Sequence, residues 1–472
     1  MLSKASEKQA VRGNNYIGIL AGVAIGAIGP LMLYKFDYVL AMDSAAKFIA
    51  VNVFIAALSS SFFYVRYRDF MAPHVLIPAF YMIIVLSSAA LEGAVSDYAL
   101  KKVYWAVTLG IVFFALGGLA SFFFGARQAQ RGGMLDMDLD RFRTLTLALW
   151  VVPVLAILYT FAVGGVPLLS ANPEVARFES MKSVGGYINN LYILLIPASM
   201  MLVILYRLGR ISLKTLLFCV FVSLSLYLLI GFRSRILYVL IAVFLAAYYY
   251  KTAILKERVP FLKTFSRGLA VLVVFAVSFT LLGYYRLKLS GEVWDYLPGH
   301  MPLWGLAIFM FLAYLRSLTV VMGRTIELAE TEGFLYGQSY IDMLLSPLPG
   351  YSPQLLDEFI KEKLFPAGFT GGGSPPMAIG EAYINFGLPG VAITMFACGL
   401  FLALMHRCLL RNGTVSGLVL FSYFFQFILI SGIFSGLLMF FQYVLSAVAV
   451  AAIVMLSRSE GNSLTDQRTT VF

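Results

Sequence analysis

The chain has 472 residues, of which 60% are hydrophobic and only 12% are charged. Soluble proteins carry roughly 25% charged residues, so this composition excludes an ordinary soluble globular protein. The net charge of +11 comes from basic residues spread over short segments between apolar runs, a pattern typical of membrane topology that does not indicate nucleic-acid binding.

Apolar runs close to the roughly 20 residues that a membrane-crossing helix needs recur from end to end. The first run is not followed by the small-residue cleavage site of a signal peptide. The sequence therefore predicts an all-α polytopic integral membrane protein. Its twelve predicted spans are Tyr16–Tyr34, Phe48–Val65, Val75–Ala90, Val103–Gly125, Leu145–Val163, Tyr187–Tyr206, Thr215–Ile230, Ile236–Tyr250, Leu269–Tyr285, Phe386–Met405, Val415–Phe434 and Leu437–Leu456.

A further apolar run, Leu303–Met322, decides the topology. Without it as a span, both termini are cytoplasmic and Lys and Arg gather on the cytoplasmic side, as the positive-inside rule requires. Arg316 within the run supports this layout, because an arginine near the bilayer centre costs at least a few kcal/mol. We therefore expect an interfacial helix within a long extracytoplasmic loop, 286–385, between nine spans in 1–285 and three spans with a cytoplasmic tail in 386–472.

The break Gly231-Phe-Arg-Ser-Arg is the most informative local feature. As one helix, the stretch from Thr215 to Tyr250 would be roughly 54 Å long at 1.5 Å per residue, whereas the hydrocarbon core is about 30 Å thick. The chain must therefore turn at the break, on the side where basic residues are normally rare. Because guanidinium groups match phosphate geometry, Arg233 and Arg235 suggest an anion site. The alternative is that they pair with lipid head groups or nearby carboxylates.

Other candidate residues occur in the predicted outer segments. Arg177, Arg286 and Arg316 are further cations that could help to stabilise a departing pyrophosphate. Glu381 lies just before the predicted span Phe386–Met405. It could act as a general base, or it could complement a helix N-terminus. His300 is either a second candidate base or a structural histidine. No spacing of His, Cys or Asp suggests a metal site, and we expect no cofactor.

Three stretches together resemble the bacterial oligosaccharide repeat-unit polymerases, the Wzy-like or O-antigen polymerase family. They are the loop Gly164-Gly-Val-Pro-Leu-Leu leading to Arg177, the break Gly231-Phe-Arg-Ser-Arg, and Ser374-Pro-Pro-Met-Ala-Ile-Gly-Glu-Ala-Tyr-Ile-Asn-Phe-Gly. The resemblance implies a C-type glycosyltransferase of the inner membrane with its active site facing the periplasm. It also implies that Arg233, Arg235 and Arg316 hold the pyrophosphate and that Arg286 assists.

The activity implied by this resemblance belongs to lipopolysaccharide biosynthesis. A glycan leaves its undecaprenyl-pyrophosphate carrier and joins the non-reducing end of another carrier-linked repeat unit, without a metal ion. A Wzz-like chain-length-determining co-polymerase is the implied protein partner. Two alternatives remain open. An O-antigen ligase would use a histidine base, for which His300 is the candidate, and a transporter or lipid flippase would carry polar groups near the midplane.

Overall fold

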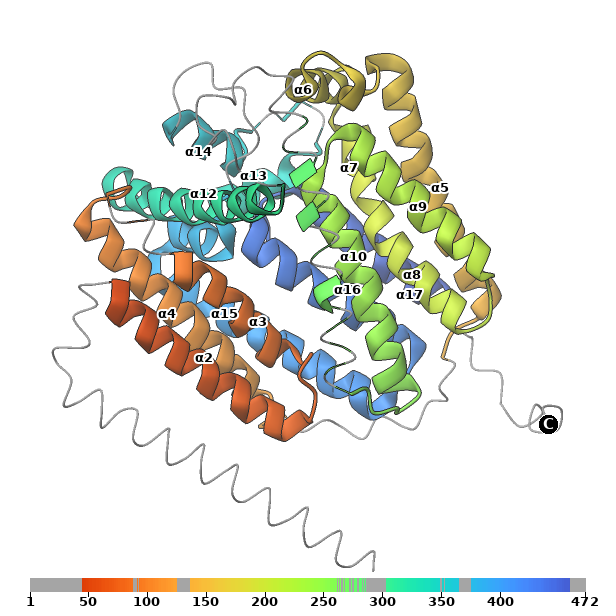
Figure 1. Ribbon diagram of the computed structural model, residues 1–472, viewed down its shortest axis with the longest axis horizontal. Coiled ribbons are helices and arrows are strands. Elements are labelled where there is room, and N and C mark those ends of the chain that lie inside the picture. Colours follow the sequence, from red (N-terminus) through yellow and green to blue (C-terminus); the bar gives the residue numbers. More distant parts are fainter. Residues whose placement is uncertain are drawn as a thin grey trace, which may run out of the picture. The chain divides into compact units, whose positions relative to one another are not determined.

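The computed structural model describes residues 45–87, 91, 93–124, 136–260, 303–348, 350–351, 353–364 and 375–458, with isolated positions between 262 and 285 (Figure 1). In this part of the chain the regular structure is helical, apart from one isolated bridge between Met137 and Arg458. Eight of the described helices are long and apolar enough to cross a membrane. These findings confirm a polytopic all-α membrane protein.

The count of twelve spans stays a prediction. Tyr16–Tyr34 lies outside the described residues, and Leu269–Tyr285 is described only at isolated positions. The chain divides into two compact units, each of which is described by itself below. The first unit consists of 1–125, 309–406 and 427–439, and the second of 126–308, 407–426 and 440–472.

The first unit is a helical bundle in which α2 packs against α3 and α4. Its helices are α2 (Ala45–Tyr67), α3 (Pro73–Ser87), α4 (Asp97–Ala120), most of α12 (Leu303–Glu332), α13 (Gln338–Leu345), α14 (Leu356–Leu364) and most of α15 (Met377–Asn412). Helix α16 (Val415–Phe434) contributes residues to both units.

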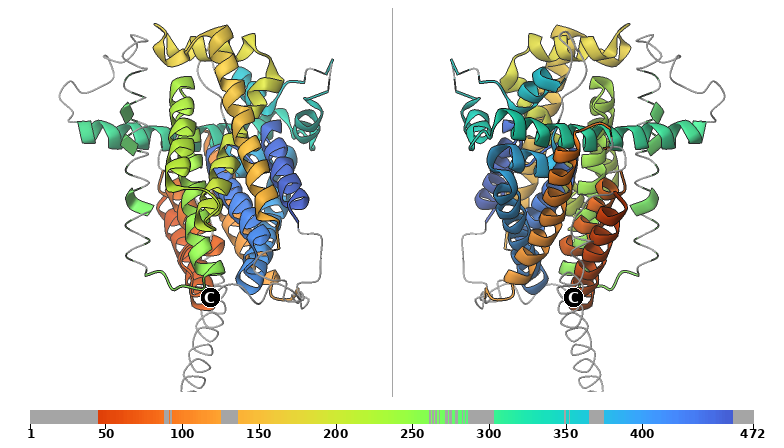
Figure 2. Two further views of the ribbon diagram at one scale, coloured as in Figure 1. Left: turned by 90° about the vertical axis from the view of Figure 1, so that its right-hand side faces the viewer. Right: turned by 90° about the vertical axis from the view of Figure 1, so that its left-hand side faces the viewer.

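Helix α12 differs in direction from its neighbours. Figure 2 shows it running across the direction of α2, α3 and α4 rather than alongside them. This orientation supports the predicted interfacial helix, whose place in the bilayer stays a prediction. The helix also continues past the apolar run that ends at Met322, as far as Glu332, because Glu327 and Glu330 find polar partners in the region of α4.

Helix α15 starts earlier than the sequence predicted. We expected the span to begin at Phe386, but the helix begins at Met377 and is interrupted by non-helical backbone at Phe386 and Gly387. Pro389 follows the interruption, and a proline inside a helix has no N–H group to donate to the preceding turn. The segment from Met377 to Asn385, which carries Glu381, is therefore helical.

The second unit contains the segments that carry Arg177, Arg233 and Arg235. Its helices are α5 (Leu139–Gly164), η2 (Pro167–Leu169), α6 (Pro173–Ser183), α7 (Gly186–Leu191), η3 (Tyr192–Leu194), α8 (Leu195–Arg207), α9 (Leu213–Ile230), α10 (Arg233–Tyr249), η4 (Tyr250–Ile254) and α17 (Phe441–Leu456). Helix α8 is its most buried helix and packs against α5 and α10. The Trp150 indole donates to Ser223 Oγ at 3.0 Å, which joins α5 to α9.

The connection between α9 and α10 is the turn predicted from the length of the run. Helix α9 ends at Ile230 and α10 begins at Arg233. Gly231 adopts the left-handed conformation with φ 88°, and the N–H groups of Gly231 and Phe232 both donate to Tyr227 O. This C-terminal motif satisfies the last carbonyls of α9 and sets the direction in which α10 leaves the turn. The predicted turn is confirmed.

Substitution of Gly231 tests the importance of this turn. We expect Gly231→Ala to lower the free energy of unfolding by about 1–2 kcal/mol, because an L-residue is strained at this φ. Gly231→Asn should be tolerated better, because asparagine enters the left-handed region more readily. Thermal unfolding of the purified variants measures the cost. Gly186→Ala is the matched control, because its Cβ would meet nothing within 4 Å; equal losses from both alanine variants would contradict the argument.

Candidate functional site

Three arginines of the second unit, Arg177, Arg233 and Arg235, form what we term the arginine cluster. Arg235 lies in the first turn of α10, with its Cζ atom 5.7 Å from the ring centroids of Phe232 and Tyr238 and 5.8 Å from that of Tyr443. Its Nη1 atom is buried and has no hydrogen-bond partner among the described residues. Buried polar groups are nearly always hydrogen-bonded, so this donor indicates a place for an acceptor.

Arg177 approaches the same aromatic ring from α6. Its Cζ atom lies 5.7 Å from the ring centroid of Phe232 and 4.9 Å from that of Phe178. The Phe232 ring is thus shared by Arg177 of α6 and Arg235 of α10. Burial lowers the pKa of Arg177 to about 10, so the guanidinium still carries its charge at neutral pH.

The position of Arg177 depends on how closely α6 approaches the end of α5. A Cβ atom on Gly164 would lie only 2.6 Å from Ser180 Cα, so the two helices can meet only if this residue is glycine. The Asn172 side chain accepts a hydrogen bond from Val175 N at 3.3 Å, and Pro173 occupies the first helical position. The Gly-Gly-Val-Pro-Leu-Leu loop therefore serves to set α6, and with it Arg177, against α5.

The first turn of α10 adds a positive end to the cluster. Its N-cap residue, Phe232, offers no side-chain hydrogen bond, and no acidic residue lies in the first turn. The N–H groups at the start of a helix and the helix dipole both favour an anion. Arg233, the first residue of α10, adds its side chain to the same turn. The first turn of α10 therefore combines main-chain N–H donors and the positive end of the helix dipole with two arginine residues, a combination that suits a phosphate.

The aromatic members of the cluster were not among the predicted site residues. Tyr238 lies three residues after Arg235, and this helical spacing is visible in the sequence once α10 is known. Tyr443 comes from α17, far along the chain, and no local pattern connects it to Arg235. The rings limit the contact of the guanidinium with water, which strengthens its electrostatic interactions.

Glu381 lies in the first unit and is bound to the main chain. Its side chain is 2% exposed. Its carboxylate accepts from Leu437 N at 2.5 Å and from Leu438 N at 3.0 Å, and so holds the turn that follows α16. These contacts resemble the expected alternative, in which the carboxylate serves main-chain N–H groups, but the turn it binds is distant in sequence. Its role as general base stays a prediction.

The rest of the Gly-Glu-Ala-Tyr-Ile-Asn-Phe-Gly stretch also organises the first unit. The Asn385 amide donates to Ser339 Oγ and to Glu381 O at 2.8 Å, and its oxygen accepts from Gly337 N at 3.2 Å. The Tyr383 hydroxyl donates to Glu330 at 2.5 Å. This stretch therefore ties α15 to α12 and to the start of α13, a role that the sequence did not reveal.

The other predicted site residues, Arg316, Arg286 and His300, are not part of the arginine cluster as the structure describes it. Arg316 is exposed on α12 and belongs to the first unit. Arg286 and His300 lie outside the described residues. Among the residues that the structure does describe, no group of three or more His, Cys, Asp or Glu side chains could hold a metal ion. The arginine cluster is therefore the site whose geometry is best defined.

Comparison with known proteins gives one match. The family model described as "Putative O-antigen polymerase" matches residues 69–446, a segment that includes the arginine cluster and Glu381. No curated protein and no solved structure matches the chain. The family match covers well over half of the sequence and bears out the resemblance seen in its motifs. The chain belongs to the O-antigen polymerase family.

Proposed function

We propose that this protein polymerises lipid-linked oligosaccharide repeat units. A hydroxyl oxygen at the non-reducing end of one carrier-linked unit bonds to the anomeric carbon of a second glycan. The bond from that carbon to undecaprenyl pyrophosphate breaks at the same time. The pyrophosphate leaves with the bonding electrons, and a base takes the hydroxyl proton. No metal ion takes part in this scheme.

The buried, unpartnered Nη1 atom of Arg235 carries the proposal. Negative charge develops on the pyrophosphate as the glycosidic bond to it breaks, and fixed cationic donors stabilise such charge more in the transition state than in the ground state. Arg177 and the first turn of α10 supply further positive charge beside Arg235. The cluster thus has the charge, the donors and the limited contact with water that a departing pyrophosphate needs.

Other parts of the scheme are extensions of this proposal. Arg316 and Arg286 are assigned to the same pyrophosphate, and Glu381 or His300 is assigned to the hydroxyl proton. The reaction takes place on the periplasmic face of a bacterial inner membrane, with both termini of the protein in the cytoplasm. A Wzz-like co-polymerase that sets chain length is the proposed protein partner.

Reconstitution tests the reaction directly. Purified protein in vesicles receives undecaprenyl-pyrophosphate-linked repeat units as the only glycan. We expect longer carrier-linked glycans to appear together with released undecaprenyl pyrophosphate. If product forms only after lipid A core is added, the protein is a ligase. Movement of intact lipid-linked glycan across the vesicle membrane, without new bonds, would instead identify a transporter.

Substitution of Arg177 tests its contribution to the proposed pyrophosphate site. Because Arg177 contributes charge but shares its aromatic neighbour with Arg235, we expect Arg177→Ala to reduce polymer formation about tenfold, less than the loss expected for a donor in direct contact. Arg177→Lys should recover part of the activity. The ladder of glycan lengths from complemented cells measures the effect. Lys182→Ala, an exposed residue at the end of α6, is the control and should leave the ladder unchanged; a full ladder from Arg177→Ala would remove this residue from the site.

A further inference from the structure

A groove in the second unit lies apart from the arginine cluster, at the other end of α10. It has a volume of about 430 Å³, within the usual range for a small-molecule site. Apolar side chains form most of its walls, and two basic side chains belong to its lining. We term it the basic-rimmed groove; its lining includes Val243, Phe244, Ala247, Val259, Arg207 and Lys251.

The basic residues lie where two candidate spans end. The span Gly186–Arg207 ends at Arg207, and the span Arg233–Ile254 carries Lys251 in its last turn. Val243 and Ala247 lie four residues apart on one face of α10, and Lys251 of the following turn η4 lines the same groove. A bound molecule would thus meet hydrocarbon along α10 and positive charge at its end.

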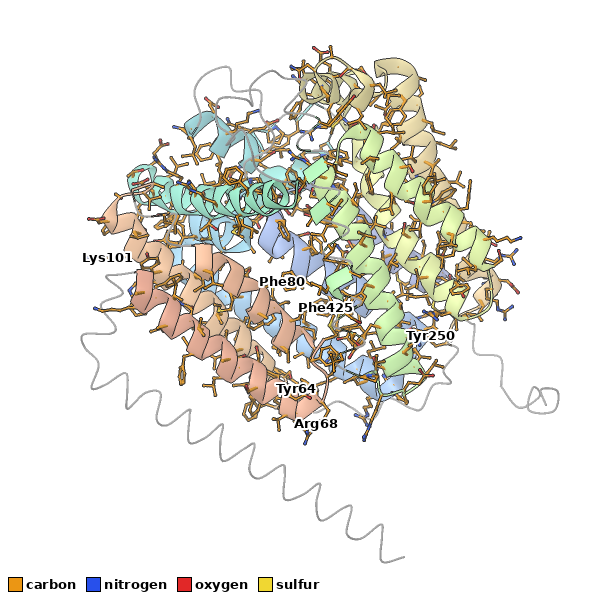
Figure 3. All side chains as sticks on the ribbon, in the orientation of Figure 1. Tyr64, Arg68, Phe80, Lys101, Tyr250 and Phe425 are labelled. Carbon is orange, nitrogen blue, oxygen red and sulfur yellow. The ribbon has the colours of Figure 1, made fainter. Side chains whose placement is uncertain are left out.

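The backbone around Lys251 departs from a regular α-helix. Residues Tyr250–Ile254 form a π-helical turn, a feature often found at functional sites. Tyr250, which is labelled in Figure 3, begins this turn, and its hydroxyl donates to Arg207 O at 2.9 Å and so holds the end of α8 beside the turn. Among the described residues, neither Arg207 nor Lys251 has a carboxylate partner. The two cations are therefore not neutralised by this part of the protein.

We propose that the basic-rimmed groove binds an anionic glycerophospholipid. One acyl chain lies along Val243, Phe244 and Ala247, and the phosphate lies between Arg207 and Lys251. The chemistry follows from the arrangement, because basic pockets between helices at the predicted cytoplasmic end of a span meet the anionic head groups of that leaflet. The groove is distinct from the proposed pyrophosphate site, so the proposal does not depend on the polymerase reaction.

The test uses the purified full-length protein in a neutral detergent, with thermal unfolding as the readout. We expect phosphatidylglycerol to raise the Tm by about 3 °C, whereas phosphatidylcholine with the same acyl chains does not. Each basic side chain near a membrane surface contributes about fivefold to binding, so the double variant Arg207→Ala/Lys251→Ala should bind about 30-fold more weakly. The double variant Lys214→Ala/Arg258→Ala removes the same charge from exposed positions outside the groove and should respond as the wild type does.

A second variant tests the hydrocarbon half of the site. Ala247→Phe fills the apolar wall but keeps both cations, and it should also abolish the shift. A single sharp peak in size-exclusion chromatography shows that each variant is folded. Equal shifts with the two lipids, equal responses of the two double variants, or a shift produced by glycerol phosphate alone would overturn the proposal. A shift produced by undecaprenyl phosphate at much lower concentrations than phosphatidylglycerol would do so as well.

Discussion

Arg235→Ala should reduce glycan polymerisation at least 100-fold without lowering the amount of folded protein. Removal of one preorganised donor to a developing anion typically costs a factor of about 10² to 10³ in kcat, and Arg235 Nη1 is a buried donor without a hydrogen-bond partner among the described residues. Arg235→Lys keeps the charge but loses the planar fork, so we expect about one tenth of the wild-type rate. The rate of chain extension on carrier-linked repeat units measures both effects.

The stability of Arg235→Ala separates a functional role from a structural one. A buried unpaired donor costs about 1–3 kcal/mol, and each cation–π contact returns only about 0.5–1 kcal/mol at partly exposed sites. Removing the side chain should therefore leave the unfolding temperature nearly unchanged while activity is lost. Lys182→Ala, an exposed cation on α6, is the control for a general change in charge. Normal polymer from Arg235→Ala would remove the pyrophosphate hypothesis, and parallel losses of stability and activity would make Arg235 a structural residue.

The sequence predicted those features that depend on length and composition. Apolar runs identify most of the helices, and the run from Thr215 to Tyr250 is too long for one span, which locates the turn at Gly231. Gly231 has a left-handed backbone at this turn, a conformation that no other residue adopts as easily as glycine. Arg233 and Arg235 lie in the same turn, so they too are site candidates that the local sequence indicates.

Features that depend on tertiary contacts could not be predicted in this way. Tyr443 meets Arg235 only after α17 has packed in the second unit. The extension of α12 to Glu332 is polar in sequence and resembles a loop, yet Tyr98 and Tyr383 donate to Glu330 within it. The sequence shows only that Glu381 lies near a span, whereas its partners, Leu437 N and Leu438 N, come from the turn after α16.

Substitution of Glu381 should strongly lower the stability of the protein. Glu381→Ala would leave two main-chain N–H groups, one buried and one part-buried, without their acceptor. Each unsatisfied group costs about 1–3 kcal/mol, against a total stability of about 5–15 kcal/mol for typical proteins. We expect this variant to lower the unfolding temperature and the yield of folded protein severely, with loss of polymer as a consequence. Glu257→Ala, an exposed carboxylate in the second unit, should change neither quantity.

Glu381→Gln distinguishes anchoring of the turn from proton transfer, because the amide keeps one acceptor oxygen but cannot take a proton from the sugar hydroxyl. If the carboxylate serves mainly to hold Leu437 N and Leu438 N, the variant should be moderately destabilised and should still extend glycans at a reduced rate. Its activity should then recover when the temperature is lowered. A variant that folds with the wild-type unfolding temperature and makes no polymer would instead assign the general base to Glu381. The contacts of the carboxylate lead us to expect the first result.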